Sequence, residues 1–282
     1  TGLPMPEFSS LNDNQVRFLA AFVLATLVSL LAWKLHTLTS DGAIAATLIG
    51  TIVAGAGGWW SGLLLMLFFI TGSLWSKLGK DRTSTVRQLR GARRDATQVI
   101  ANGGIPAILI FAGWLLDTGS LVIAAIASIA AATADTWATE LGRLSRAVPR
   151  SIVSWRRVPP GTSGAVSLPG TIATACGSLL IAIVAGIGIA SNWLPASSGS
   201  VTVFAVVGVA GIAGSFIDSL LGATIQQVFR CNTCGIILET RDHLPRHDVV
   251  HVRGLPGVTN DIVNLTSLIG AAILGLLVIR VI

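Results

Sequence analysis

Charged side chains are scarce in this sequence. Asp, Glu, Lys and Arg make up 11% of its 282 residues, against about 25% in a typical soluble domain. Hydrophobic residues make up 52%. This composition excludes a disordered chain and argues against an ordinary soluble enzyme, because lipid is the solvent that accommodates so much apolar surface.

Several motifs are also missing. Three cysteines are too few for a disulfide framework. The chain has no GxxxxGKS or GxxxxGKT loop, no protein-kinase signature set and no HExxH helix, which excludes a Walker A site, a protein kinase and a zincin protease. No positively charged segment precedes a short apolar stretch near the start, so we expect no signal peptide.

Eight apolar runs are candidates for membrane-crossing helices. They are Val16–Trp33, Ala43–Ala56, Trp59–Leu78, Val99–Leu116, Ser120–Leu141, Leu168–Trp193, Val201–Val228 and Val258–Ile282. The second is short and rich in glycine, so it also fits a re-entrant or broken helix. The predicted fold is an all-α, polytopic membrane helix bundle of about eight transmembrane helices, with residues 1–282 as one transmembrane catalytic domain.

The distribution of positive charge predicts the topology. The net charge is +6, and all of the 19 Lys and Arg residues except Arg17 and Arg280 fall into four stretches between spans. With eight spans, these four stretches lie on one side of the membrane. The positive-inside rule makes that side cytoplasmic and places both termini outside. A seven-span arrangement would break this segregation, so the charges favour keeping the short second span.

The two halves of the chain resemble each other weakly. Gly42-Ala43-Ile44 is matched by Gly164-Ala165-Val166, and Gly72-Ser73-Leu74 is matched by Gly214-Ser215-Phe216. A parallel 4+4 internal repeat would explain this order and would place a site between the halves. The alternative is that small residues recur by chance in helices that pack through them.

Acidic side chains lie within or at the ends of predicted spans, where an ionisable group must face a cavity or a partner. Asp135 and Glu140 end the fifth span, Asp218 lies in the seventh, and Asp261 begins the eighth, one turn before Asn264. Converging carboxylates repel one another unless a cation neutralises them, and Mg²⁺ prefers such oxygen ligands. We assign catalysis and Mg²⁺ binding to Asp135, Asp218 and Asp261, with Glu140 in support. The alternative for each acid is a salt bridge to a loop arginine or a hydrated helix end.

The loops on the same side supply groups that suit phosphate oxygens. We assign phosphate contacts to Lys77, Arg90, Arg94, Asn102, Arg156, Gly161, Thr162, Ser163, Gly164 and Asn264. The Gly-Thr-Ser-Gly turn is expected to run into the sixth span and to offer backbone N–H groups at a helix N-terminus. Taken singly, the loop charges could equally set topology and contact anionic lipid headgroups. Acids, basic loops and a glycine turn on one side together indicate a polyphosphate held by Mg²⁺ beside a lipid.

A cytoplasmic loop at residues 229–257 carries a Cys/His pattern. Cys231 and Cys234 are followed by His243 and His247, and both pairs have the spacing of zinc ligands, although the gap between the pairs is shorter than usual. A structural zinc could therefore hold this loop. The alternative is two reduced thiols and solvated histidines.

Several segments resemble an integral membrane family typified by the plant phytyl-phosphate kinase of vitamin E synthesis. They are Ser40-Asp41-Gly42-Ala43, residues 98–104, residues 134–142 (ADTWATELG), residues 158–167 (VPPGTSGAVS), residues 214–224 and residues 260–264. The resemblance covers nearly the whole chain. It implies Mg²⁺-dependent phosphorylation of an isoprenyl monophosphate, such as phytyl or geranylgeranyl phosphate, to the diphosphate, with CTP or another nucleoside triphosphate as donor. It also implies a site on the cytoplasmic face of a prokaryotic cell membrane or a plastid membrane, with no nucleic-acid partner.

Two other functions fit parts of the sequence. A transporter of an anionic substrate would share repeats, Gly-broken helices and intramembrane acids, but the polar residues here crowd one face. A lipid-phosphate cytidylyltransferase would use the same groups as a kinase and would differ in its products.

Overall fold

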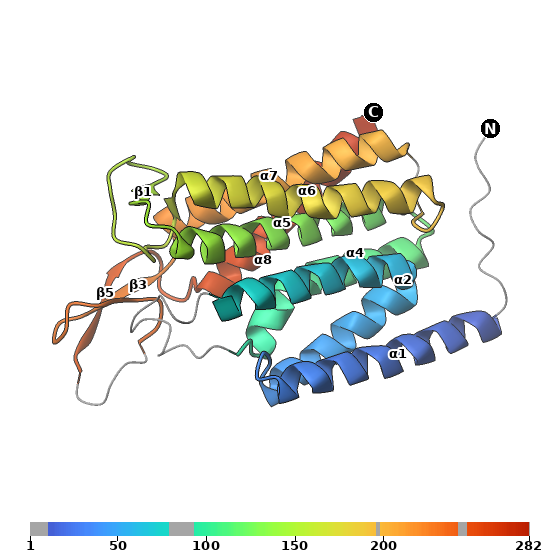
Figure 1. Ribbon diagram of the computed structural model, residues 1–282, viewed down its shortest axis with the longest axis horizontal. Helices are drawn as coiled ribbons and strands as arrows, with labels where there is room; N and C mark the ends of the chain where they lie inside the picture. The colour runs from blue at the N-terminus through green and yellow to red at the C-terminus, as the bar shows by residue number, and fades with distance from the viewer. Residues whose placement is uncertain (1–10, 79–92, 196–197, 242–246, 282) are drawn as a thin grey trace.

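The computed structural model describes residues 11–78, 93–195, 198–241 and 247–281. In this part of the chain, seven helices are long and apolar enough to cross a membrane. They are α1 (Leu11–Lys34), α2 (Ser40–Leu78), α4 (Ala96–Leu115), α5 (Gly119–Leu144), α6 (Leu168–Ala190), α7 (Ser200–Thr224) and α8 (Asn260–Val281). The helices run side by side along the long axis of the molecule (Figure 1), as predicted for a polytopic membrane protein.

Helix α2 contains two of the predicted spans. Gly58 interrupts it with φ 77° and ψ 172°, a backbone conformation that is essentially restricted to glycine. The halves fold back on each other, because a Cβ built at Gly62 would lie 3.1 Å from the Cβ of Ala54. Gly42 in the first half and Gly72 in the second both lie against Arg94. The half before Gly58 is about 27 Å long at 1.5 Å per residue, close to the thickness of the hydrocarbon core.

The positions of the chain ends agree with this arrangement. Helix α1 begins and α8 ends at the same end of the bundle (Figure 1). A chain that starts and finishes on one side crosses an even number of times, so α2 must count as two crossings. The eight predicted segments are therefore present, with two of them joined at Gly58.

Helix α5 is the centre of the bundle. It packs against α2, α4, α6, α7 and α8, and most of its residues from Val122 to Ala134 are alanines or other small side chains that are buried. Small residues let helices approach closely where lipid supplies no hydrophobic driving force. Helix α1 packs mainly on α2. The two halves of the chain thus pack differently, and the parallel 4+4 repeat stays a prediction.

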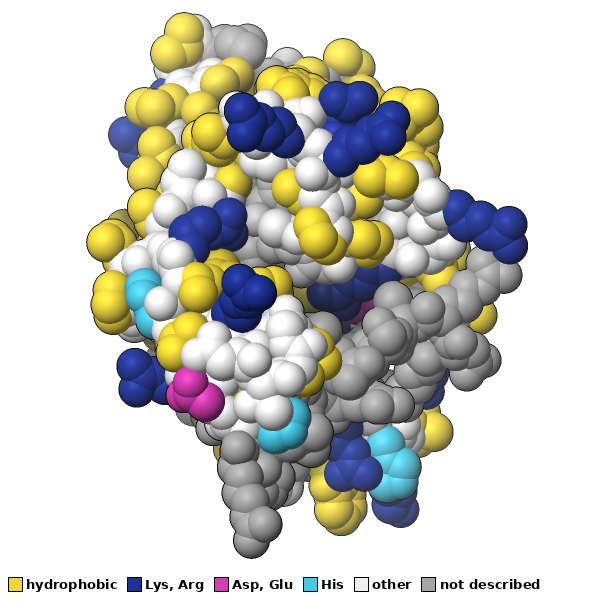
Figure 2. Space-filling view, turned by 90° about the vertical axis from the view of Figure 1, so that its left-hand side faces the viewer, with side chains coloured by type: hydrophobic (Ala, Val, Ile, Leu, Met, Phe, Trp, Pro, Cys, Tyr) yellow, Lys and Arg dark blue, Asp and Glu magenta, His cyan; other side chains and the backbone are white. Residues whose placement is uncertain are grey.

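Two small antiparallel sheets lie at the end of the bundle opposite the chain ends (Figure 1). Strands β1 (Arg150–Ser151) and β2 (Ala165–Val166) form one; β3 (Val228–Cys231), β4 (Ile237–Leu238) and β5 (Val249–Arg253) form the other, in the order β4-β3-β5. The all-α prediction is correct for the membrane-spanning part and misses these strands. Figure 2 shows this end of the molecule, with Lys and Arg side chains spread over it and few acidic ones.

Candidate active site

Three helices meet closely at Gly214. A Cβ at this position would lie 2.5 Å from the Cβ of Ala131 on α5 and 2.9 Å from the Cβ of Ala271 on α8. Glycine at this position therefore allows α7 to approach both neighbours. One helical turn further toward the end that carries the sheets, α7 and α5 present Asp218 and Asp135 at matching heights.

The two carboxylates face the same region. Asp135 and Asp218 are both half-buried, and each follows by one helical turn the contact between Ala131 and Gly214. On the α8 side, Ser267 Oγ lies 3.3 Å from Asp218 Oδ2 and 2.8 Å from the backbone oxygen of Asn264, so its hydroxyl can donate to either. Asp135 and Asp218 thus lie at the same level on neighbouring helices, and their convergence on one metal ion stays a prediction.

The other predicted acids are placed differently. Glu140 is buried and accepts a 2.7 Å hydrogen bond from Ser76 Oγ on α2, so it joins α5 to α2. Asp261 is half-buried in the first turn of α8. Among the described residues, no three carboxylates have oxygens that all lie within 4.8 Å of one another. The oxygen chemistry of Asp135 and Asp218 suits Mg²⁺, and the full ligand set stays a prediction.

An apolar cavity of about 390 Å³ lies between α1, the two halves of α2 and α4, within the size range of small-molecule sites. Leu24 and Trp59 in its lining are about half exposed, so the cavity reaches the lipid-facing side of the bundle. Its polar lining is concentrated toward the start of α4, at Arg94, Gln98 and Asn102.

Arg94 connects this cavity to α5. A Cβ at Gly72 would lie 2.7 Å from Arg94 Nη2 and 3.0 Å from Thr136 Cγ2, so glycine leaves room for the guanidinium next to α5. Thr136 follows Asp135 directly. The guanidinium also lies 5.4 Å and 5.6 Å from the ring centroids of Phe68 and Phe69. The polar end of the cavity therefore adjoins the segment of α5 that carries Asp135.

The local fold fixes Arg94 through its backbone. Its N–H donates to the oxygen of Thr37, and its oxygen accepts from the N–H of Thr39. Asp95 then caps α4, accepting from Gln98 N–H at 2.9 Å. The side chain of Asn102 donates to the backbone oxygen of Gln98. Arg90 lies outside the described residues; Lys77 and Arg156 are exposed at the same end of the molecule.

The Gly161–Gly164 turn departs from its predicted position. Strand β2 and the N-cap residue Ser167, which accepts from Gly170 N–H, stand between the turn and α6. The turn therefore precedes α6 as expected but does not itself form the N-terminus of that helix, where its N–H groups were predicted. The turn packs instead on the end of α7, where a Cβ at Gly222 would lie 3.1 Å from Gly164 N.

Three residues that sequence reasoning did not select hold this turn in place. Gln226 Nε2 donates to Ser163 Oγ at 3.2 Å and to Glu239 Oε1 at 3.3 Å. Arg253 Nη2 donates to the backbone oxygens of Ser163, at 3.3 Å, and of Gly222, at 3.0 Å. Through these hydrogen bonds the turn, the end of α7 and the segment after β4 form one network. Its members come from distant loops, and no local motif marks them.

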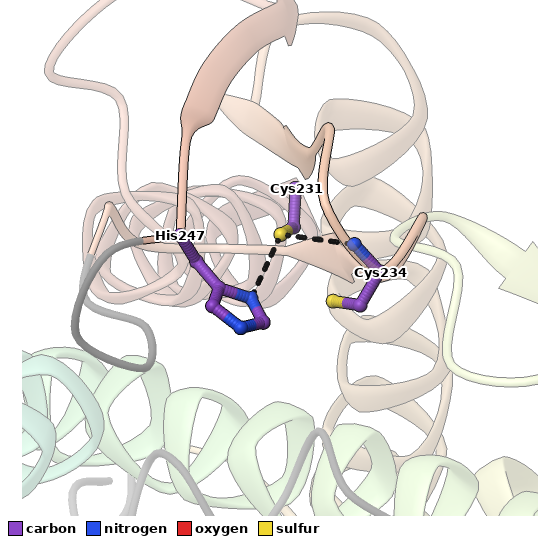
Figure 3. Close-up of side chains that lie close together, drawn as sticks. All are labelled: Cys231, Cys234 and His247. Atoms are coloured by element: carbon purple, nitrogen blue, oxygen red, sulfur yellow. Dashed lines mark hydrogen bonds between the residues drawn. The ribbon is translucent and has the colours of Figure 1, made fainter.

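The predicted Cys/His loop brings three of its four named side chains together. The ligand atoms of Cys231, Cys234 and His247 lie within 4.8 Å of one another (Figure 3); His243 lies outside the described residues. Burial raises the pKa of the Cys231 thiol, but hydrogen bonds from Cys234, His247 and Thr233 outweigh this and lower it to about 6.

Comparison with known proteins agrees with the architecture. The family model described as integral membrane protein DUF92 matches residues 23–272. Protein PGR of Arabidopsis thaliana is 32% identical over 274 residues, covering 90% of this chain and 93% of that protein. An uncharacterized membrane protein of Methanocaldococcus jannaschii is 32% identical over 220 residues, or 76% and 86% of the two chains.

A further relative is more distant. Protein VTE6, chloroplastic, of Arabidopsis thaliana is 27% identical over 154 residues, covering 52% of this chain and 46% of that protein. No solved structure matches the chain. The family model covers all of the helices described above except the first half of α1 and the last part of α8. The chain is thus a multi-pass integral membrane protein that belongs to the DUF92 family.

Proposed function

We propose that this protein is a kinase that transfers a phosphoryl group from CTP or another nucleoside triphosphate to an isoprenyl monophosphate. The observation that carries the proposal is the meeting of the apolar cavity with the acidic region. Arg94 lines the polar end of the cavity, and its guanidinium and Thr136, the residue after Asp135, both lie against Gly72. An amphiphile with a long apolar tail and an anionic head fits this combination.

The cavity supports an isoprenyl tail in particular. Its lining is almost entirely aliphatic and aromatic, and exposed side chains such as Leu24 place one side of it toward lipid. Burying each CH₂ group is worth about 0.8 kcal/mol, so a tail that passes from the bilayer into this cavity avoids the cost of entering water. The phosphate would then lie near Arg94 and Asn102.

The chemistry requires charge stabilisation more than a base. A phosphate monoester is already an anion near pH 7, so it can attack the donor phosphoryl group without a strong general base. The remaining task is to hold two polyanions together and to stabilise the charge that spreads over the transferring group. Mg²⁺ held by Asp135 and Asp218, with Asp261 and Asn264 nearby on α8, would supply charge neutralisation. Arg94 would orient the acceptor phosphate.

The sequence resemblance to the phytyl-phosphate kinase family also supports this function. The motifs that resemble the family of phytyl-phosphate kinase fall on the structural parts just described. Residues 134–142 carry Asp135, and residues 214–224 carry Asp218. Residues 98–104 supply Gln98, Val99, Asn102 and Gly103 to the cavity lining. Protein VTE6 is a distant relative of the chain. The concentration of Lys and Arg at this end of the bundle supports a cytoplasmic orientation for the site.

The function is tested by product analysis with purified protein in detergent. With Mg²⁺ and CTP, phytyl or geranylgeranyl phosphate should give the prenyl diphosphate and CDP, and EDTA should stop the reaction. Mass spectrometry of a panel of prenyl phosphates and nucleotides identifies both products. A nucleotidyl lipid with pyrophosphate would establish a cytidylyltransferase instead, and the absence of any covalent product across the panel would refute both.

A further inference from the structure

The ligand atoms of the Cys/His cluster have the spacing of a metal site. Cys231 Sγ lies 3.3 Å from His247 Nδ1. Zinc–sulfur and zinc–nitrogen bonds of about 2.3 Å and 2.0–2.1 Å at a tetrahedral angle would separate these two atoms by roughly 3.6 Å. The Cys234 thiol lies within 4.8 Å of both. All three side chains point toward one another (Figure 3).

The backbone around the cysteines is shaped for a bound cation. Cys231 ends strand β3, and Gly235 turns the chain back with φ 74° and donates its N–H to the Cys231 oxygen at 2.8 Å. Cys234 N–H points at Cys231 Sγ, 3.4 Å away. This turn brings the second thiol beside the first and places an N–H group at the Cys231 sulfur.

His247 is held in place by its neighbour. Asn232 pairs with Asp248 twice: its N–H donates to the Asp248 oxygen at 2.9 Å, and its side-chain amide donates to Asp248 Oδ2 at 2.7 Å. The segment that brings His247 to the cluster is therefore fastened to the turn that carries both cysteines.

The β3–β5 sheet has little apolar core of its own. Its buried cluster consists of Phe229, Cys231 and Leu238, with Ile236 and Val249 packed against them. So small a unit usually needs a metal or disulfides to remain folded. A zinc ion bound by Cys231, Cys234 and His247 would add a direct link between the end of β3, the turn after it and the segment before β5.

We propose that Cys231, Cys234 and His247 supply three ligands to a structural Zn²⁺, and that this ion keeps the Gly161–Gly164 turn docked on α7. Thiolate and imidazole are the ligands of structural zinc. Two links join the turn to the same sheet. Glu239, which follows β4, accepts a hydrogen bond from Gln226, and Gln226 also donates to Ser163. Arg253, at the end of β5, donates to the backbone oxygens of Ser163 and Gly222.

Metal analysis of purified protein tests the ion. Wild-type protein should retain about one zinc per chain after dialysis, and Cys231→Ser should lose nearly all of it. Cys176→Ser, which changes the lone cysteine of α6, is the matched control and should keep its zinc. Because Cys231→Ser could unfold the sheet, metal-free wild-type protein should also be titrated with Co²⁺, which should give the visible absorption bands of a tetrahedral thiolate complex.

Absence of both stoichiometric zinc and these Co²⁺ bands from the wild type would overturn the site, as would equal zinc loss in Cys231→Ser and Cys176→Ser.

Hydrogen exchange read by mass spectrometry tests the link to the turn. Removing zinc should speed amide exchange at residues 159–166 as well as in the sheet, while α1 is unchanged. Faster exchange confined to the sheet would refute the proposed coupling. Neither readout depends on kinase activity.

Discussion

Asp218→Asn is expected to lower kcat for prenyl-phosphate phosphorylation by about 10²- to 10³-fold, the usual cost of losing one preorganised electrostatic contact to a transition state. Asparagine has nearly the same shape and keeps an oxygen that can accept from Ser267, so the change removes charge and little packing. The measurement is the initial rate of diphosphate formation at saturating CTP and prenyl phosphate.

The matched control for this variant is Asp117→Asn. Asp117 is an exposed carboxylate between α4 and α5, at the end of the bundle that carries the chain ends. Its φ of 47° is a conformation that asparagine accepts readily. This variant should retain the wild-type rate and the wild-type unfolding temperature. Full activity in Asp218→Asn would remove Asp218 from the site.

Arg94→Ala is expected to lower kcat/KM for the prenyl phosphate by about 10- to 10²-fold, because a hydrogen bond to a charged group is worth about 1.5–3 kcal/mol. The backbone bonds of Arg94 to Thr37 and Thr39 do not need its side chain, so the fold should tolerate the change. Arg94→Lys should be intermediate, because lysine keeps the charge and loses the planar fork.

Arg93→Ala controls for the loss of a positive charge at this end of the molecule. Arg93 is the preceding residue, is exposed, and contacts His36 rather than the cavity. Its kcat/KM should stay near the wild-type value. If Arg93→Ala and Arg94→Ala lost the same activity, bulk charge would explain the effect and the assignment of Arg94 to the phosphate would be wrong.

The membrane architecture could be predicted from the sequence because it depends on composition and on the side to which charges segregate. Charged side chains are costly in lipid, so the 17 Lys and Arg between the spans were expected on one side of the membrane. This requirement predicted eight crossings, although the span before Gly58 is short. Asp135 and Asp218 were selected for a related reason, since an ionisable side chain within a span must face a cavity or a partner; their role in the site stays a prediction.

The arrangement of the loops could not be predicted in the same way. Strands of two to five residues are too short to show a hydrophobic period. Contacts such as Arg253 with Ser163 join positions 90 residues apart, and no local pattern records them. The role predicted for Glu140 depended on an unknown neighbour, which the structure identifies as Ser76.

The central claim is that Asp135 on α5 and Asp218 on α7 act on one transferring phosphoryl group. The most direct test compares the rates of Asp135→Asn, Asp218→Asn and the double variant, with ³²P-labelled CTP to detect slow transfer. Residues that act as a unit show non-additive losses, so the double variant should be about as slow as the slower single variant. A double variant whose loss equals the product of the two single losses would place the carboxylates in separate roles and contradict the account.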